Sequence, residues 1–317
     1  MLADIGGTNA RFAWQSGPGA PLQHVQVLQC HEHAGFEQAA QIWLSEHQLP
    51  SPERAALAVA CAVQSDQVKL TNNHWTFSIQ ALQRHFGLRQ LEVVNDFTAL
   101  ALALPSIPSQ HLHQIGGAAQ GPFEHKLPVA LLGAGTGLGV SGLLPDPHGG
   151  WIPLAGGGGH VSLPIHDEVQ YRIWSALHAR DGHVSAESVL SGQGLVNLHD
   201  SLLYQSTGQW PAQSLTPAQI TALALGQQDP LAAQVIAVFC NWLGAVAGDL
   251  ALTLGATGGV FIGGGIAPRF KEALAAGGLR RCFESKGIYS FYVQPVPLWL
   301  IDAPESPALQ GVATLLD

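Results

Sequence analysis

The chain has 317 residues, of which 47% are hydrophobic and 11% are charged. This composition is typical of an ordered globular protein and excludes a disordered chain, and the length suits two domains. The formal net charge is −9 and no run is rich in Lys or Arg, which argues against nucleic acid or an anionic membrane surface as the main partner.

Four isolated cysteines, Cys30, Cys61, Cys240 and Cys282, form no Cys-x-x-Cys pair. We therefore expect free thiols and a cytoplasmic location rather than a disulfide framework or a zinc ribbon. A glycine turn follows Met1 almost at once, so we expect no signal peptide. Gly, Pro or Asp interrupts each apolar stretch before about 18 residues, so we expect no membrane span.

In the first third of the chain, predicted strands alternate with predicted helices. The strands are expected at 25–28, 55–63 and 91–94, and the helices at 36–47, 78–85 and 98–104. Ser78 suits the N-cap of the second helix. Asn95 and Asp96 directly follow the third strand, where open α/β sheets place their ligands.

Residues 106–126 contain several Pro and Gly and are predicted to connect two domains. A hairpin is expected from strands 129–132 and 139–144, followed by helices at 167–180 and 186–203 and a mostly helical region at 216–254. Small residues within 231–254 would let a neighbouring helix pack closely. Strands at 260–262 and 298–301 and a helix after Pro307 complete the prediction.

Three glycine-rich turns, at 4–9, 133–139 and 258–265, each follow an apolar run. Glycine lets the backbone approach a ligand and point consecutive N–H groups at it, which suits a polyanion. Asp4, beside the first turn, could hold Mg²⁺ through water, because this cation prefers oxygen ligands. Three such turns far apart in the sequence indicate an ATP-dependent phosphotransferase.

Asp96 is the candidate general base. A hydroxyl that attacks a γ-phosphate needs a carboxylate within hydrogen-bond reach, and the remaining catalysis is mostly positioning and charge neutralisation. Asn95 and Asp96 are also residues that cap helices, so the spacing alone leaves both interpretations open.

His160 and Glu187 carry groups that can bind vicinal hydroxyls of a polyol. By residue type alone a structural role is favoured for both, His160 at the start of a strand and Glu187 as a carboxylate in the first turn of a helix. Residues 71–75 are likewise either a polar turn or a loop on the substrate side.

Several segments together resemble bacterial glucokinases, in the same order and over nearly the whole chain. The matching segments are 4–11, 71–75, 94–99, 133–139, the turn before His160, 182–187, 189–192, 258–266 and 268–270. The resemblance implies the α/β fold of the sugar kinase, heat-shock chaperone and actin superfamily, with two ribonuclease-H-like (actin-like ATPase) domains and a ligand cleft between them. We expect a small α/β domain of residues 1–106 plus 298–317, a large α+β domain of residues 107–297, and a homodimer.

The resemblance also implies roles at the matching positions. Asp96 would be the general base toward the sugar 6-hydroxyl, Asn95 would bind the adjacent ring hydroxyls, and His160 and Glu187 would hold hydroxyls near the anomeric end. Three loops would bind ATP: a first phosphate loop of Asp4, Gly6, Gly7, Thr8 and Asn9, a second of Gly135, Thr136 and Gly137, and an adenosine-side turn of Gly263, Gly264 and Gly265. Asp4 would lie near Mg²⁺, with water between them.

Two features depart from the family pattern. Gly157 occupies the place of a Glu that is expected to hydrogen-bond the sugar, and the loss of such a charged bond costs about 1.5–3 kcal/mol. Only three residues precede Asp4, so the strand that leads into the first phosphate loop is short and its anchor is expected to be weaker.

These features lead to one main hypothesis and two alternatives. The main hypothesis is phosphorylation of D-glucose by Mg·ATP to glucose 6-phosphate and ADP. The first alternative is a kinase for another hexose, because Gly157 changes the partner of one hydroxyl. The second is a sugar-binding regulatory relative with weak activity, which an intact Asp96 and the lack of a visible helix-turn-helix segment disfavour.

Overall fold

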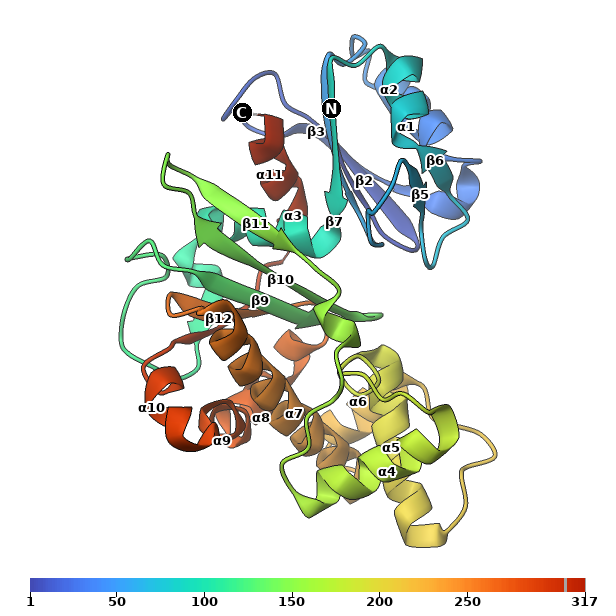
Figure 1. Cartoon of the computed structure of the whole chain (residues 1–317). Coiled ribbons are helices and arrows are strands. Elements are labelled where there is room, and N and C mark those ends of the chain that lie inside the picture. Colours follow the sequence, from blue (N-terminus) through green and yellow to red (C-terminus); the bar gives the residue numbers. More distant parts are fainter. Residues whose placement is uncertain (305–306, 317) are drawn as a thin grey trace. The chain divides into compact units, whose positions relative to one another are not determined.

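The computed structural model describes residues 1–304 and 307–316, which divide into two compact units (Figure 1). Unit 1 consists of Met1–Pro108, Pro153–Gly156 and the described residues from Ala303 onward, and unit 2 consists of Ser109–Ile152 and Gly157–Asp302.

The strands form two main sheets and one small hairpin. Their bounds are β1 (Leu2–Ile5), β2 (Asn9–Trp14), β3 (Gln23–Gln29), β4 (Arg54–Val59), β5 (Gln67–Lys69), β6 (Thr76–Ser78), β7 (Gln90–Asn95), β8 (Leu112–Gln114), β9 (Val129–Ala134), β10 (Leu138–Pro145), β11 (Trp151–Ala155), β12 (Gly259–Gly263) and β13 (Leu298–Ile301). The expected hairpin of residues 129–144 is confirmed, because β9 pairs antiparallel with β10.

The sheet of unit 1 has the order β3-β2-β1-β4-β7. Strand β1 lies in its middle, antiparallel to β2 and parallel to β4, which is parallel to β7. All four residues of β1 pair on both sides, so this short strand is fully held in the sheet. Its apolar residues Leu2, Ala3 and Ile5 are completely buried, as expected for a central strand.

The sheet of unit 2 has the order β11-β10-β9-β12-β13-β8. Its first five strands repeat the order of the unit 1 sheet, with β9 antiparallel to β10 and parallel to β12, and β12 parallel to β13. The two sheets therefore share a topology that no sequence repeat indicates.

Two structural features differ from the sequence-based domain division. Strand β13, which was assigned to the small domain, pairs with β12 and β8 in the sheet of unit 2. Residues 106–126, expected to be a connection, contain β8 at the edge of the same sheet. Both strands find their partners far away in the sequence, and local composition does not reveal such pairing. Of the segment 298–317, residues 305, 306 and 317 lie outside the described part.

Helices α2 to α7 each begin at a residue whose side chain caps them. Their bounds are α1 (Phe36–Glu46), α2 (Ile79–Phe86), α3 (Asp96–Ala103), α4 (Glu168–Asp181), α5 (Gly192–Thr207), α6 (Pro217–Leu225), α7 (Pro230–Leu254), α8 (Lys271–Ala275), α9 (Gly278–Glu284), α10 (Ser290–Val293) and α11 (Ala308–Ala313). Short 3₁₀ turns are η1 (Cys30–Glu32), η2 (Leu104–Ser106), η3 (Ser109–His111), η4 (Gly158–His160), η5 (Ala267–Phe270), η6 (Gly287–Tyr289) and η7 (Thr314–Leu316). The expected cap at Ser78 is confirmed, since its side chain accepts the N–H of Ala81.

The helix expected at 186–203 starts later than predicted. Helix α5 begins at Gly192, where the Ser191 side chain caps it by accepting the N–H of Gly194. Residues 186 and 187 instead donate their N–H groups to the carbonyls of Val161 and Gly159. Contacts with a distant segment thus replace the first turns of the expected helix.

Helix α7 runs through the core of unit 2. By length and composition alone it could span a membrane, but 72% of its most apolar window is buried inside the protein. A Cβ atom at Gly244 would clash with the carbonyl oxygen of Leu279 in α9, and one at Gly248 with that of Phe283. The expected close packing of a neighbouring helix on these small residues is confirmed.

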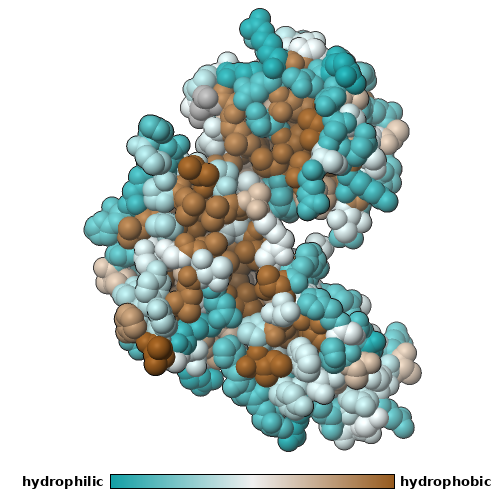
Figure 2. All heavy atoms as spheres, viewed as in Figure 1, coloured by the Kyte–Doolittle hydropathy of each residue, from teal (hydrophilic) through white to brown (hydrophobic). Residues whose placement is uncertain are grey.

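Large hydrophobic side chains are also exposed at the end of η6 and in α10. Ile288 is 87% exposed and Phe291 69% exposed. Figure 2 shows hydrophobic side chains gathered on the surface over α10. These residues add exposed apolar surface to unit 2 and lie outside its core.

Candidate active site

The parallel strands of unit 1 bring two predicted site segments, the first glycine turn and Asn95–Asp96, to one edge of its sheet, together with Cys61. In the register of the sheet, Ile5 pairs with Val59 and Val59 pairs with Asn95. The first glycine turn follows β1, Cys61 follows β4, and Asp96 follows β7. The carboxyl ends of parallel strands share one edge, so these groups lie within two strand spacings, about 10 Å, of one another.

The first glycine loop is a tight turn that is closed by the backbone carbonyl of Asn9 and held by the side chain of Asn73. The N–H of Gly6 donates to the carbonyl of Asn9 at 2.9 Å, and Nδ2 of Asn73 donates to the carbonyl of Gly6 at 3.2 Å. A Cβ atom at Gly7 would lie 3.0 Å from Cβ of Asn72. The polar turn at 71–75 therefore packs directly on the predicted phosphate loop and leaves little space for a side chain at residue 7.

Asn95 and Asp96 both cap helix α3, as the structural interpretation expected. Oδ1 of Asn95 accepts the N–H of Phe97 at 2.9 Å, and Oδ1 of Asp96 accepts the same N–H at 3.0 Å. Nδ2 of Asn95 donates to the carbonyl of Cys61 at 3.1 Å. Capping uses one oxygen of each side chain, so it is compatible with a second role at the same position.

The carboxyl group of Asp96 is desolvated. Burial raises its pKa, and hydrogen bonds from Phe97 and Asn95 oppose this shift in part. Burial also raises the pKa of the Cys61 thiol, and the negative charge of Asp96 adds to that increase. A partly buried carboxylate with a raised pKa, at the sheet edge that also bears a predicted phosphate loop, is a candidate general base.

In unit 2, the second and third glycine turns lie side by side. Strands β9 and β12 are parallel neighbours with Gly133 opposite Gly263, and the N–H of Ile266 donates to the carbonyl of Ala134 at 3.2 Å. A Cβ atom at Gly264, which has a φ of +81°, would clash with Ala134. Glycine is required there because two backbones approach closely.

The outer side of these two turns is open. A Cβ atom at Gly135 or at Gly265 would meet nothing within 4 Å. The turns are therefore closely packed on the inside and leave space outside, which is the shape that a phosphate-binding backbone needs.

His160 and Glu187 come together next to the second loop. Nδ1 of His160 lies 3.9 Å from Oε1 of Glu187, and the N–H of Glu187 donates to the carbonyl of Gly159 at 2.8 Å. Oε2 of Glu187 accepts the N–H of Leu138 at 2.7 Å. The alternative expectation that Glu187 lies in the first turn of a helix is wrong, because α5 begins five residues later.

Gly157 leaves room for a larger side chain. Its φ is −100°, which any residue can adopt, and a Cβ atom there would meet only Cδ2 of His160, at 4.0 Å. The two residues after it differ, since a Cβ atom at Gly158 would lie 2.7 Å from Cγ1 of Val140 and one at Gly159 would clash with the carbonyl of Leu138. The departure from the family pattern therefore falls just before the η4 turn, at a position where the backbone does not require glycine.

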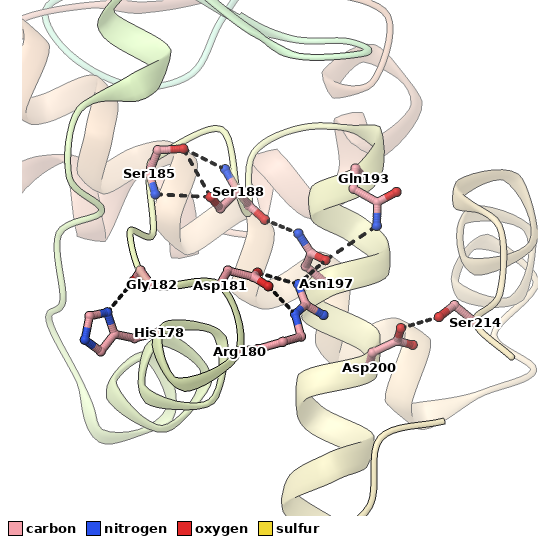
Figure 3. Close-up of polar contacts among 10 residues, drawn as sticks. All are labelled: His178, Arg180, Asp181, Gly182, Ser185, Ser188, Gln193, Asn197, Asp200 and Ser214. Atoms are coloured by element: carbon pink, nitrogen blue, oxygen red, sulfur yellow. Dashed lines mark hydrogen bonds and ion pairs between the residues drawn. The ribbon is translucent and has the colours of Figure 1, made fainter. Parts of the chain in front are cut away.

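A polar network behind Glu187 escaped the sequence analysis (Figure 3). Asn197 is 8% exposed, donates from Nδ2 to the carbonyl of Ser188 at 2.8 Å, and accepts from Nη2 of Arg180 at 2.9 Å. The signal in the sequence was Asn197 itself, a polar residue between Val196 and Leu198 in α5. A buried amide of this kind nearly always has specific partners.

The residues near the first loop fit a water-bound Mg²⁺ better than a protein-enclosed metal. Asp4 lies in β1 opposite Arg11 of β2. In the described part of the chain, no three His, Cys, Asp or Glu side chains form a group that could hold a metal. Mg²⁺ commonly binds through one or two carboxylates, waters and substrate phosphates, and this donor set fits that mode.

Solved structures define the class of protein. The glucokinase from an Antarctic psychrotroph is 35% identical, with a TM-score of 0.87 over 99% of this chain and 97% of that one. The ROK hexokinase from Thermus thermophilus is 18% identical, with a TM-score of 0.66 over 99% and 97%. The repeated sheet topology and these matches identify the actin-like ATPase fold of sugar kinases, as predicted.

Sequence comparisons then give the family. The Glucokinase family model matches residues 1–317. A glucokinase of Aromatoleum aromaticum is 46% identical over 318 residues, covering 100% of this chain and 94% of the relative, and one of Chromobacterium violaceum is 44% identical, covering 100% and 88%. The chain belongs to the glucokinase family, which confirms the resemblance found in its motifs. It is an enzyme that phosphorylates glucose with ATP.

Proposed function

We propose that the chain transfers the γ-phosphoryl group of ATP to the 6-hydroxyl of D-glucose, with Asp96 as general base. The observation that carries this proposal is the desolvated carboxylate of Asp96 at the sheet edge that also bears the first glycine loop. Oδ1 is engaged by the N–H of Phe97, so Oδ2 is the atom proposed to take the proton of the attacking hydroxyl. Deprotonation makes that oxygen a better nucleophile toward the γ-phosphorus.

The sugar is proposed to contact Asn95, Asp96, His160 and Glu187. Oδ1 of Asn95 keeps one further lone pair beyond its bond from Phe97, which suits a donating ring hydroxyl, while Nδ2 donates to the carbonyls of Cys61 and Val59. The side chain of His160 is 72% exposed and that of Glu187 33%, so both can reach a ligand. Their pairing offers a donor and an acceptor to hydroxyls near the anomeric end.

The nucleotide is proposed to lie on the glycine turns. Residues 6–9 and 135–137 would donate backbone N–H groups to the phosphates, and residues 263–265 would let the adenosine approach the backbone. Their close inner packing and open outer side support this assignment. Mg²⁺, held through water near Asp4, would neutralise phosphate charge.

A kinase that phosphorylates glucose but prefers a different hexose is the second candidate. The observation that favours it is Gly157, where the family pattern has Glu and where the structure has space for one. One hydroxyl of glucose would then lack its usual acceptor. A sugar that lacks this hydroxyl, or carries it in another orientation, would lose less binding free energy from the missing Glu.

We also propose a cytoplasmic homodimer with the two-domain organisation of the family. The family resemblance supports the dimer and the domains, and the four free cysteines agree with a reducing compartment. Light scattering of the purified full chain tests the dimer, for which a monomer mass is the contrary result.

The first experiment compares the wild-type chain with Asp96→Ala on glucose, mannose, glucosamine and fructose with Mg·ATP. The proposal expects glucose to give the highest kcat/KM, and Asp96→Ala to lose about 10²–10⁴-fold in kcat while glucose binding by calorimetry persists. Highest turnover on another hexose would support the second candidate. Retained turnover by Asp96→Ala would remove Asp96 from the role of base.

A further inference from the structure

One carboxylate contacts both the second phosphate loop and the proposed sugar side of unit 2. Oε2 of Glu187 accepts the N–H of Leu138, the residue that directly follows Gly137 of the loop, at 2.7 Å. Its other oxygen, Oε1, lies 3.9 Å from Nδ1 of His160. The two oxygens of Glu187 therefore face two different parts of the site.

The loop is packed onto this carboxylate. A Cβ atom at Gly137 would clash with Oε2 of Glu187. The turn is closed by the N–H of Gly135, which donates to the carbonyl of Gly137 at 2.8 Å, and the N–H of Gly192 donates to the carbonyl of Gly135 at 2.8 Å. Glu187 thus supports the side of the loop where Leu138 lies, and Gly192 of helix α5 supports the other.

The backbone of Glu187 is itself held at both ends. Its N–H donates to the carbonyl of Gly159, and its carbonyl accepts the hydroxyl of Ser191 at 2.9 Å. These backbone bonds fix the start of the side chain, and the N–H of Leu138 then orients its carboxylate before any ligand binds.

The network in Figure 3 also holds Ser188, the residue that follows Glu187. Nδ2 of Asn197 donates to the carbonyl of Ser188, and Oδ1 of Asn197 accepts from Arg180. Arg180 also makes two hydrogen bonds to Asp181 and lies 4.9 Å over the ring of Trp210. Because the guanidinium can only donate, it fixes the amide of Asn197 with its nitrogen toward Ser188.

We propose that Glu187 is a positioning residue for the second phosphate loop, in addition to its contact with the sugar. This inference rests on the proposed function, in which residues 135–137 bind phosphate. The bond to Leu138 is charge-assisted and holds the backbone that presents its N–H groups to the nucleotide. A sugar hydroxyl that binds Oε1 acts on the same carboxylate, so sugar and nucleotide affinities are coupled through it, and by linkage the coupling is reciprocal.

The test measures binding of the β,γ-imido analogue of ATP, with Mg²⁺ and without sugar, to the full chain by calorimetry. Glu187→Ala is expected to weaken this binding about tenfold, because it removes a charged acceptor. Glu187→Gln keeps an acceptor oxygen for Leu138 and is expected to stay within about threefold of the wild type. Both variants are expected to raise the KM for glucose.

His160→Ala is the matched control. It lies on the sugar side and has no contact with Leu138, so it is expected to raise the KM for glucose and to leave analogue binding without sugar unchanged. Backbone hydrogen exchange of residues 133–140 gives a second readout, in which Glu187→Ala exchanges faster than the wild type. Glu187→Asp, which keeps the charge but withdraws the oxygen from Leu138, replaces Glu187→Ala if that variant does not fold.

Unchanged analogue binding together with unchanged backbone exchange of residues 133–140 in Glu187→Ala or Glu187→Asp overturns the inference, as does an equal loss of analogue binding in Glu187→Gln and Glu187→Ala. Unchanged analogue binding with faster exchange would instead contradict the proposed function, because Glu187 would hold the loop but the loop would not bind phosphate. Failure of the sugar assignment has a different signature, an unchanged KM for glucose in His160→Ala. These failures are therefore distinguishable.

Discussion

The side-chain amide of Asn95 joins the ends of two neighbouring strands to the start of a helix. Nδ2 donates to the carbonyl of Cys61, just after β4, and Oδ1 accepts the N–H of Phe97 in α3. Asp96 accepts the same N–H, so its carboxyl group is held by the cap at the edge of the sheet. The cap and the proposed catalytic role therefore depend on the same short segment.

The raised pKa of Asp96 predicts an acid limb in the pH profile. A general base works only when ionised, so kcat/KM for glucose is expected to fall as the pH drops through the pKa of Asp96. Because burial raises this pKa, the fall should begin above the range of an ordinary aspartate. Initial rates with saturating Mg·ATP over a series of buffers measure it.

Thermal unfolding at each pH serves as the control, because acid unfolding would also lower the rate. A profile that stays flat down to the ordinary aspartate range, with the protein folded, would contradict the role of Asp96.

Asp96→Asn is expected to raise the Tm at neutral pH. A carboxyl whose pKa is higher in the folded state than in the unfolded state stabilises the fold below the unfolded pKa, and this contribution is lost as the pH rises through the folded pKa. At neutral pH the wild type carries the cost of the buried charge, and neutral Asn removes it while still accepting the N–H of Phe97. The gain should shrink as the pH falls and Asp96 becomes protonated in the wild type.

Asp66→Asn is a matched control, for which we expect a change in Tm in the opposite direction. Hydrogen bonds from Ser78 and Gln80 lower the pKa of Asp66, so its charge stabilises the fold above the unfolded pKa and this contribution is lost at acid pH. Asp66→Asn should therefore lower the Tm at neutral pH. If both variants changed the Tm in the same direction, burial would not be the dominant contribution of Asp96 to stability.

Gly157→Glu is expected to lower the KM for glucose about tenfold or more, because it restores a charged acceptor worth about 1.5–3 kcal/mol. The backbone at Gly157 accepts any residue and the space beside His160 is open. Steady-state kinetics with varied glucose at saturating ATP give the KM.

Gly156→Glu is the matched control, since a Cβ atom at Gly156 also meets nothing within 4 Å. It adds the same charge one residue away and should leave the KM for glucose unchanged. If both variants lower it equally, general electrostatics rather than a specific contact would explain the gain, and if Gly157→Glu has no effect, another group already replaces the missing Glu.

Gly244→Ala is expected to lower the free energy of unfolding by about 1–3 kcal/mol, because the added methyl group must push α9 away from α7. A Cβ atom there would clash with the carbonyl of Leu279. Urea denaturation followed by tryptophan fluorescence measures the change. In Gly17→Ala, where a Cβ atom meets nothing within 4 Å, the change should stay within about 0.5 kcal/mol. Equal stability of the two variants would contradict close packing of these helices.

Much of the local structure could be read from the sequence because it depends on adjacent residues. The cap at Ser78, the hairpin of β9 and β10, and the glycine turns all follow from side chains and backbone preferences within a few positions. The same holds for Asn95 and Asp96, where capping and a second role were both anticipated.

The sequence did not reveal contacts that join distant segments. It placed β13 with the small domain, although this strand pairs with β12 and β8. It also started α5 too early, because the apolar pattern of 186–203 does not show that the N–H of Glu187 is bound by Gly159. Local secondary-structure propensity does not indicate such distant partners.

By itself, then, the sequence determined the family and the nature of the chemistry and indicated candidate residues for it, because motifs and turn chemistry are local. The tertiary structure alone decided how those residues are held. The bond between Glu187 and Leu138 spans 49 residues, and that between Asn197 and Ser188 links a helix to a loop. Such contacts form only when packing brings the partners together, since each buried donor or acceptor must be satisfied by whatever group the fold places beside it.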